Sequence, residues 1–449
     1  MYQTSSQMLD PNKRVFLFLC IIVGLMIPDV MINYVAEYLV PQITSLLGIV
    51  LFVAIVAVCA ISRYPLLQHI KQRSKETISK DFSLKLIQNT VLIVQYSLIA
   101  LTALITLQIL VFSNYSTYLL TATALTSEVT AVVLLAIFSY KFFSWISLNK
   151  QSIVVLLYGL SFALASFSFA VLSIDDFSLL SQKGPERTPQ SEVVFPNTYV
   201  EPGSFSDMLW NIYTYADTIS FSLLIPATAL LLHHYSERVG KIKFWIIVTL
   251  PLIYFLISKI ENFGLYSPMT DSEWFNWLLF ISLNSTAGGI LFGTAFWTIA
   301  KTLRQESAVR DYVVFAAYGF VLLFISNQVT PVTAPYPPFG IVSMTFLPLS
   351  AYLLFLGVYS TAVSISQDNQ LRKSVRKFAR ENVNLLSSIG TAQMEQEIQR
   401  TVKSMKDVVA EQEKGLQEQT GIEANLEEDE MKKYLEEVMQ EVGKSKKPT

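Results

Sequence analysis

Residues 86–112 read LIQNTVLIVQYSLIALTALITLQILVF, a run that contains no Asp, Glu, Lys, Arg or His. A helix rises about 1.5 Å per residue, so a run of this length exceeds the roughly 30 Å of hydrocarbon in a bilayer. Lipid offers no partner to backbone N–H and C=O groups, and such a run must therefore be helical if it crosses a membrane. The stretch predicts a transmembrane helix.

Similar apolar runs recur along most of the chain. Together with the first they lie at residues 15–39, 43–61, 86–112, 119–140, 153–173, 208–232, 244–258, 274–300, 312–329 and 341–363. Hydrophobic residues make up 52% of the 449 residues and charged residues only 15%, against roughly 25% charged in an average soluble domain. The mean hydropathy is +0.43. We therefore predict an all-α, polytopic membrane helical bundle of about ten transmembrane helices over residues 1–363.

Basic residues are distributed unevenly among the connections between these runs. The connection after the second run holds six, namely Arg63, Lys71, Arg73, Lys75, Lys80 and Lys85, whereas the connections on the opposite side hold only Lys183, Arg187 and Lys259. Lys and Arg mark cytoplasmic loops. We expect a multi-pass protein of the cell membrane with both termini in the cytoplasm. A secretory signal after Lys13-Arg14 is the alternative, but no small-residue cleavage site follows it.

Residues 364–449 form a charged segment with a narrow apolar stripe. Its first apolar positions follow a 4-3 spacing and are Leu371, Val375, Phe378, Leu385 and Ile389. This pattern favours a cytoplasmic helical tail that forms a coiled coil or packs on a partner helix. The alternative is an ordered helix that lies along the membrane or folds back on the protein. The expected partners are the lipid bilayer and either a cytoplasmic protein or a second copy of the chain.

A basic cluster opens this tail. Its members are Arg372, Lys373, Arg376, Lys377 and Arg380. Basic residues next to a membrane are attracted by anionic lipid. The cluster is interpreted as a topological anchor, with a lipid-sensing switch as the sharper alternative.

Several polar residues fall inside the apolar runs. Charges at membrane depth are costly and suggest function, and neither Glu128 nor Asp217 has a Lys or Arg at matching depth. The candidate residues for a ligand or ion cavity are Glu128, Asp217, Asn284, Asn327 and Gln328. Asp29 and Glu37 could contribute to the same cavity. The structural alternative is that each acid is neutral, or faces a small aqueous pocket, and supports helix packing.

Two connections on the outer side are rich in proline. The segment 175–207 contains four prolines and six acids, among them Asp175 and Asp176, and is predicted to be irregular. The segment 333–340 reads TAPYPPFG and is expected to form a stiff, partly extended turn.

Recognisable catalytic chemistry is missing from the sequence. It has no Walker A motif, no G-x-G-x-x-G and no H-E-x-x-H. The two cysteines, Cys20 and Cys59, lie in apolar runs and form no disulfide framework or metal site. We expect no cofactor, no metal, no nucleic-acid partner and no enzymatic activity.

The last third of the chain resembles multi-spanning archaeal and other prokaryotic membrane proteins of unknown function, and the membrane-embedded regions that precede signalling domains. The resemblance rests on the stretch 309–319, on the turn Pro335-Tyr-Pro-Pro338 and on the passage into Leu371-Arg-Lys-Ser-Val375. It implies a sensor region, and we expect residues 364–449 to hold no kinase or cyclase domain, which is a departure from those regions.

Three functions remain open. The preferred hypothesis is a multi-pass membrane sensor or scaffold whose cytoplasmic tail binds a partner or self-associates. The second is a secondary transporter or channel for a small solute, cation or proton that uses the buried acids. The third is a membrane-bound enzyme.

Overall fold

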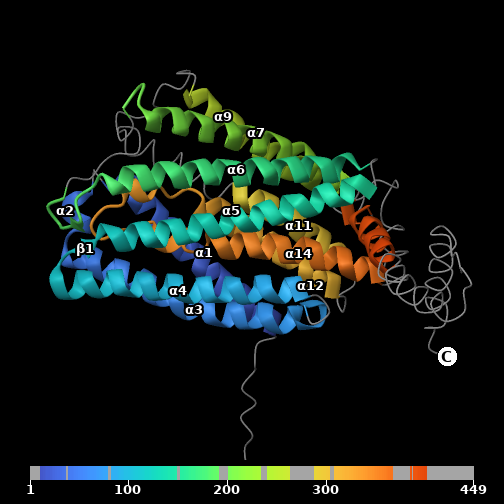
Figure 1. Ribbon diagram of the computed structural model, residues 1–449, viewed down its shortest axis with the longest axis horizontal. Coiled ribbons are helices and arrows are strands. Elements are labelled where there is room, and N and C mark those ends of the chain that lie inside the picture. Colours follow the sequence, from blue (N-terminus) through green and yellow to red (C-terminus); the bar gives the residue numbers. More distant parts are fainter. Residues whose placement is uncertain are drawn as a thin grey trace, which may run out of the picture.

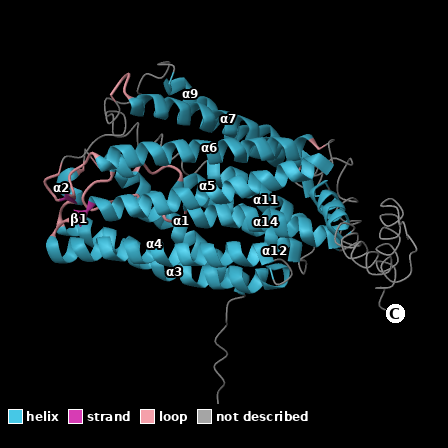
Figure 2. Cartoon of the chain, viewed as in Figure 1, coloured by secondary structure: helices cyan, strands magenta, loops and turns pink. Residues whose placement is uncertain are grey.

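The computed structural model of the protein consists mainly of long helices that run nearly side by side along its longest axis (Figure 1, Figure 2). A short ribbon joins the loops at one end of the bundle, where β1 (Tyr115–Ser116) pairs antiparallel with β2 (Glu186–Arg187). We call this the β1 end, and the opposite end, where residues 388–401 lie, the tail end. The residues that the structure describes are 11–36, 39–78, 82–148, 152–191, 201–233, 240–262, 288–303, 308–367, 385–386 and 388–401.

The helices follow the predicted apolar runs. In chain order they are α1 (Pro11–Val35), α2 (Val40–Ile43), α3 (Leu46–Ile78), α4 (Phe82–Phe112), α5 (Thr117–Leu148), α6 (Ile153–Ser181), α7 (Phe205–His233), α9 (Lys241–Asn262), α11 (Gly288–Thr302), α12 (Ala308–Ser326), the 3₁₀ turn η2 (Pro331–Thr333), α13 (Ile341–Met344) and α14 (Leu347–Gln367). Their backbone hydrogen bonds close within each helix, as lipid requires.

Eight helices within the described ranges are long and apolar enough to cross a membrane. They cover Phe16–Val35, Leu46–Ser74, Leu84–Phe112, Thr117–Leu148, Ile153–Ser181, Phe205–His233, Val309–Ser326 and Ile341–Ser366. The all-α bundle is thereby confirmed, and the helices support a multi-pass membrane protein. α9 and α11 fall on the seventh and eighth predicted runs, but a total of ten spans stays a prediction.

α14 is the central helix of the bundle. It lies between α3 and α4 on one side and α6 and α7 on the other (Figure 1), and it packs against α3, α4, α5 and α12. Every residue from Val329 to Ala362 is buried. A helix that is apolar all round is expected in such a position, because no face of it needs to meet water.

α12 and α14 approach so closely that only glycine fits at two points of their contact. A Cβ atom at Gly357 would lie 2.6 Å from the backbone nitrogen of Ala316 and 2.6 Å from the backbone oxygen of Tyr312. A Cβ atom at Gly319 would lie 2.8 Å from the backbone nitrogen of Leu354. Small residues allow this kind of approach between membrane helices.

The second predicted span ends too early in the sequence-based interpretation. That interpretation stops at residue 61 and assigns Arg63 to a cytoplasmic connection. In the structure α3 continues to Ile78, and Arg63 is only 2% exposed. The guanidinium group tolerates burial because it finds a hydroxyl acceptor and an aromatic ring inside the bundle.

The fifth predicted span is likewise too short. Ending it at residue 173 assigns Asp175 and Asp176 to an irregular loop, and that assignment is wrong. α6 continues to Ser181, and both acids are 1% exposed. Apolar residues at 177, 179 and 180 continue the helical pattern beyond the two acids.

The described part of the tail folds back on the bundle. Residues 388–401 are helical and lie across the tail end (Figure 1). Leu385 and Ile389, two positions of the predicted apolar stripe, are buried together with Ala392. This favours the alternative of a helix that packs on its own protein. The coiled coil and the domain boundary after residue 363 stay predictions. The same holds for the helical structure expected in the rest of the tail.

Candidate functional site

A single helical turn, α13, sits inside the bundle and is held at its N-terminal end by an acid from α1. Asp29 is completely buried. Its Oδ1 accepts a hydrogen bond from the backbone N–H of Gly340 at 2.9 Å, and its Oδ2 accepts from the N–H and the hydroxyl of Ser343 at 2.9 and 2.7 Å. Free N–H groups at a helix start favour a carboxylate. Asp29 thus acts as a cap supplied by another helix.

The C-terminal end of the same turn is held by polar side chains from α5 and α3. The hydroxyl of Ser127 donates to the backbone oxygen of Met344 at 2.6 Å. The guanidinium of Arg63 donates to Oγ1 of Thr345 at 2.6 Å and lies 3.8 Å above the centre of the Phe346 ring. An acid at the start and a base at the end of α13 both match the direction of its dipole.

The proline-rich segment before α13 is buried at the β1 end, where its backbone needs partners that water cannot supply. Side chains from three other parts of the chain provide them. Nδ2 of Asn33 donates to the backbone oxygen of Phe339 at 2.9 Å, and the hydroxyl of Tyr115 donates to that of Pro335 at 3.0 Å. The ammonium group of Lys183 donates to the backbone oxygen of Val332. The segment is therefore a plug within the bundle.

Beside this plug, two carboxyl groups face each other across the contact between α5 and α6. Glu128 is completely buried and interacts with the side chains of Asp176 and Ser173. None of the four oxygens of Glu128 and Asp176 has a hydrogen-bond partner of ordinary geometry among the described residues. Asp175 differs, because its Oδ1 accepts a hydrogen bond from Ser206 on α7. We call Glu128 and Asp176 the carboxyl pair.

Tyr213 on α7 lies in the electrostatic field of several titratable groups. Its side chain interacts electrostatically with four titratable groups, Asp217, Tyr34, Asp176 and Glu128. A cavity shared by Glu128 and Asp217 stays a prediction. Sequence reasoning missed Asp176, although two acids followed by further apolar residues were a usable signal.

The other predicted site residues lie after α12, on α1 or outside the described residues. Asn327 and Gln328 directly follow α12 and lead into the plug, and their backbone N–H groups donate to the backbone oxygens of Leu323 and Ile325. Asp29 caps α13. Asn284, Glu37 and the basic cluster of Arg372, Lys373, Arg376, Lys377 and Arg380 lie outside the described residues.

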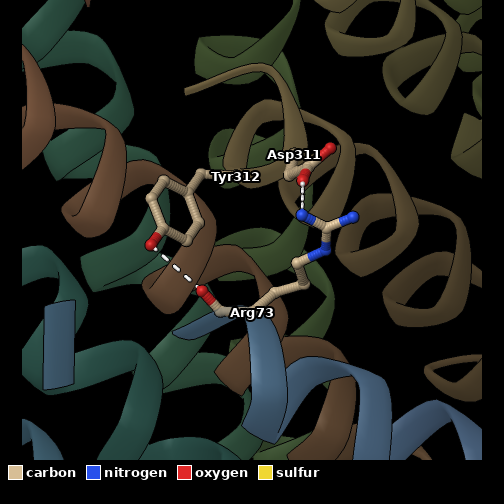
Figure 3. Close-up of polar contacts among 3 residues, drawn as sticks. All are labelled: Arg73, Asp311 and Tyr312. Carbon is tan, nitrogen blue, oxygen red and sulfur yellow. Dashed lines mark hydrogen bonds and ion pairs between the residues drawn. The ribbon is translucent and has the colours of Figure 1, made fainter. Parts of the chain in front are cut away.

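The C-terminal part of α3 meets the start of α12 through an ion pair. Nη1 of Arg73 lies 3.3 Å from Oδ2 of Asp311, and the hydroxyl of Tyr312 donates to the backbone oxygen of Arg73 at 3.3 Å (Figure 3). Asp311 lies in the first turn of α12, where a negative charge is favourable. The Arg73 side chain is 47% exposed, so we interpret the pair as a link between helices.

The tail helix docks at the tail end through polar and apolar contacts. The indole N–H of Trp145 on α5 donates to Oε1 of Gln393 at 3.0 Å, and the amide of Gln396 donates to the hydroxyl of Ser144. Gly390 lies against the Ile365 side chain on α14. The tail therefore contacts both α5 and α14.

Comparison with protein families, with curated proteins and with solved structures finds no match to this chain. The resemblance to membrane-embedded sensor regions consequently stays a prediction. Fold and site together define an all-α, multi-pass membrane bundle with a polar interior.

Proposed function

We propose that this protein is a multi-pass membrane sensor in which the state of the polar interior controls the position of the tail helix. The observation that carries the proposal is the docking of residues 388–401 on α5 and α14. These two helices also border the polar interior, because α5 bears Ser127 and Glu128 and α14 follows α13 directly.

A shift of α5 relative to α14 would connect the polar interior with the docking site of the tail helix. Glu128 and Trp145 lie on one continuous helix, about 25 Å apart at 1.5 Å per residue. On α14, Tyr359 stacks on Trp145 with ring centroids 6.4 Å apart. A change of charge at Glu128 alters the forces between α5 and its neighbours, and a tail that spans two helices responds to their relative movement. Such coupling requires two arrangements of the bundle that the stimulus favours differently.

The test measures the distance between tail and bundle. Spin labels at Ser147→Cys and Gln399→Cys, two exposed positions, are placed in a Cys20→Ser, Cys59→Ala background, and the protein is studied in lipid nanodiscs. Between about pH 5 and about pH 8, we expect two distance populations whose proportions change. Glu128→Gln is expected to abolish the change.

The matched control is Asp207→Asn, an acid near the start of α7 that accepts a hydrogen bond from the backbone N–H of Gly203 at 2.8 Å. This variant is expected to respond like the unmodified protein. A single distance population that neither pH nor Glu128→Gln changes would contradict the sensor.

A secondary transporter is the second candidate, favoured by the same unpartnered carboxyl pair and by Asp217 nearby. It predicts cation or proton flux in liposomes that falls in Glu128→Gln and in Asp217→Asn. Equal flux in the variants and the unmodified protein would remove these residues from any transport pathway.

A further inference from the structure

We propose that Glu128 and Asp176 form a proton-binding site in which the two carboxyl groups share one proton. This inference names the proton as the ligand of the polar interior. It rests on the proposed sensor function only where proton binding is said to move the tail helix.

Glu128 and Asp176 are both buried between packed helices. Glu128 is 0% exposed and Asp176 is 1% exposed, and they come from two helices that pack along most of their length. Water therefore cannot solvate a charge on either group. Two carboxylates in contact at such a place repel each other strongly, because the local dielectric screens their charges poorly.

The neighbouring groups supply no compensating ion pair. No described Lys or Arg lies within salt-bridge distance of either carboxyl group. Lys183 acts on Asp176 electrostatically, but its ammonium group donates to the backbone oxygen of Val332. Arg63 is engaged with Thr345 and Phe346.

The remaining titratable groups around the pair are acids and tyrosines. Asp175 precedes Asp176 on α6, Tyr213 and Asp217 come from α7, and Tyr34 comes from α1. On the sides facing α4 and α14, α4 beyond Lys85 contributes only Tyr96, and α14 contributes only Tyr352 and Tyr359. These groups add negative charge or none, so they favour retention of a proton.

One proton satisfies both groups at once. A carboxylic acid donates one O–H, and the neighbouring carboxylate accepts it, which turns the repulsive contact into a charge-assisted hydrogen bond. Gain or loss of that proton changes the net charge between α5 and α6 by one unit. The ligand class of the site is therefore the proton.

The test counts protonated carboxyl groups by infrared spectroscopy of the full chain in nanodiscs near neutral pH. The carbonyl band of carboxylic acids, normalised to the amide band, is compared between the unmodified protein and the double variant Glu128→Gln/Asp176→Asn. We expect the double variant to lose the intensity of one carboxylic acid. Loss of two would mean two separate protons, and loss of none would mean two ionised groups; either result overturns the shared proton.

The single variants keep the test decisive if the double variant does not fold. In Glu128→Gln or Asp176→Asn the shared band must vanish or move in frequency, because its hydrogen-bond partner has changed. A residual band at an unmoved position would overturn the proposal. Asp207→Asn, the control, is expected to leave the band as it is.

The proton site and the sensor can fail separately. If the double variant loses one acid but the spin-label distances ignore pH, the shared proton stands and the sensor is wrong. If no acid is lost but the distances respond to pH, the sensor stands and its proton binds elsewhere.

Discussion

Asp29 accepts hydrogen bonds from both the backbone N–H and the hydroxyl group of Ser343, although the two residues lie at opposite ends of the membrane-spanning part of the chain. The same carboxylate accepts from the N–H of Gly340. One buried acid on the first helix thereby fixes the turn that precedes the central helix.

Replacing Asp29 by alanine is expected to destabilise the bundle strongly. The substitution leaves the N–H groups of Gly340 and Ser343 buried without acceptors, at a cost of about 1–3 kcal/mol each. We expect a total loss of about 3 kcal/mol or more, measured as a lower apparent Tm in detergent micelles. Asp29→Asn retains one acceptor oxygen and should lose less. A Tm change no larger than that of Asp207→Ala, which removes an exposed hydrogen bond, would refute the capping role.

Arg63 is expected to require its planar guanidinium group and not only its charge. Lysine cannot reproduce both the hydrogen bond to Thr345 and the stacking over Phe346. We expect Arg63→Lys to cost about 1–2 kcal/mol, and a double-mutant cycle with Thr345→Val to give a coupling energy of about 1 kcal/mol. Lys71→Arg, at an exposed position of the same helix, is the matched control and should change the stability little. Additive single effects in the cycle would exclude the Arg63–Thr345 contact.

The positions of most of the long apolar helices could be predicted, because lipid imposes a length requirement that a sequence window reads directly. The run at 86–112 predicts α4 (Phe82–Phe112) within a few residues. The prediction of where a helix ends fails where a buried polar residue finds a partner on a distant segment, because the helix then continues past that residue. Arg63 pairs with Thr345, and Asp175 pairs with Ser206; a window of one helix cannot contain such pairings.

Candidate site residues could be proposed from the sequence for a related reason. The cost of burying a charge singles out Glu128 and Asp217 from the sequence, and a cavity shared by the two stays a prediction. The approach of Asp176 to Glu128 depends on how α5 and α6 pack side by side, which the sequence does not specify. The hypothesis that Asp29 contributes to the cavity stays a prediction, although its described hydrogen bonds all serve α13 and the turn before it.

Docking of the tail is expected to depend on the hydrogen bond between Trp145 and Gln393. Trp145→Phe keeps an aromatic ring against Tyr359 but removes the N–H donor. A loss of about 1 kcal/mol corresponds to roughly a fivefold larger open population. Hydrogen exchange over residues 388–401 should accelerate by that factor. Gln399→Ala, at an exposed position of the tail helix, is the control; equal exchange in both variants would show that the indole hydrogen bond does not hold the tail.

The ion pair between Arg73 and Asp311 is expected to contribute little to stability. Partly exposed pairs contribute about 0–1 kcal/mol and weaken in salt. We expect Asp311→Asn to lower the apparent Tm only slightly, and the difference to disappear at high salt. A large change that persists in salt would assign the pair a role beyond surface linkage.

The close contact between α12 and α14 can be tested by comparing the same substitution, Gly→Ala, at a crowded and at an open position. A methyl group at Gly357 would meet the backbone of Ala316 and Tyr312 at 2.6 Å, whereas a methyl group at Gly24 on α1 would meet nothing within 4 Å. Overpacking costs about 1–3 kcal/mol, but alanine at an open helical site is more favourable than glycine by up to about 1 kcal/mol. We therefore expect Gly357→Ala to lower the apparent Tm and Gly24→Ala to leave it unchanged or raise it. If Gly357→Ala left the Tm unchanged or raised it, the close approach of α12 and α14 would be wrong, because Gly24→Ala measures the backbone effect of the same substitution at an open site.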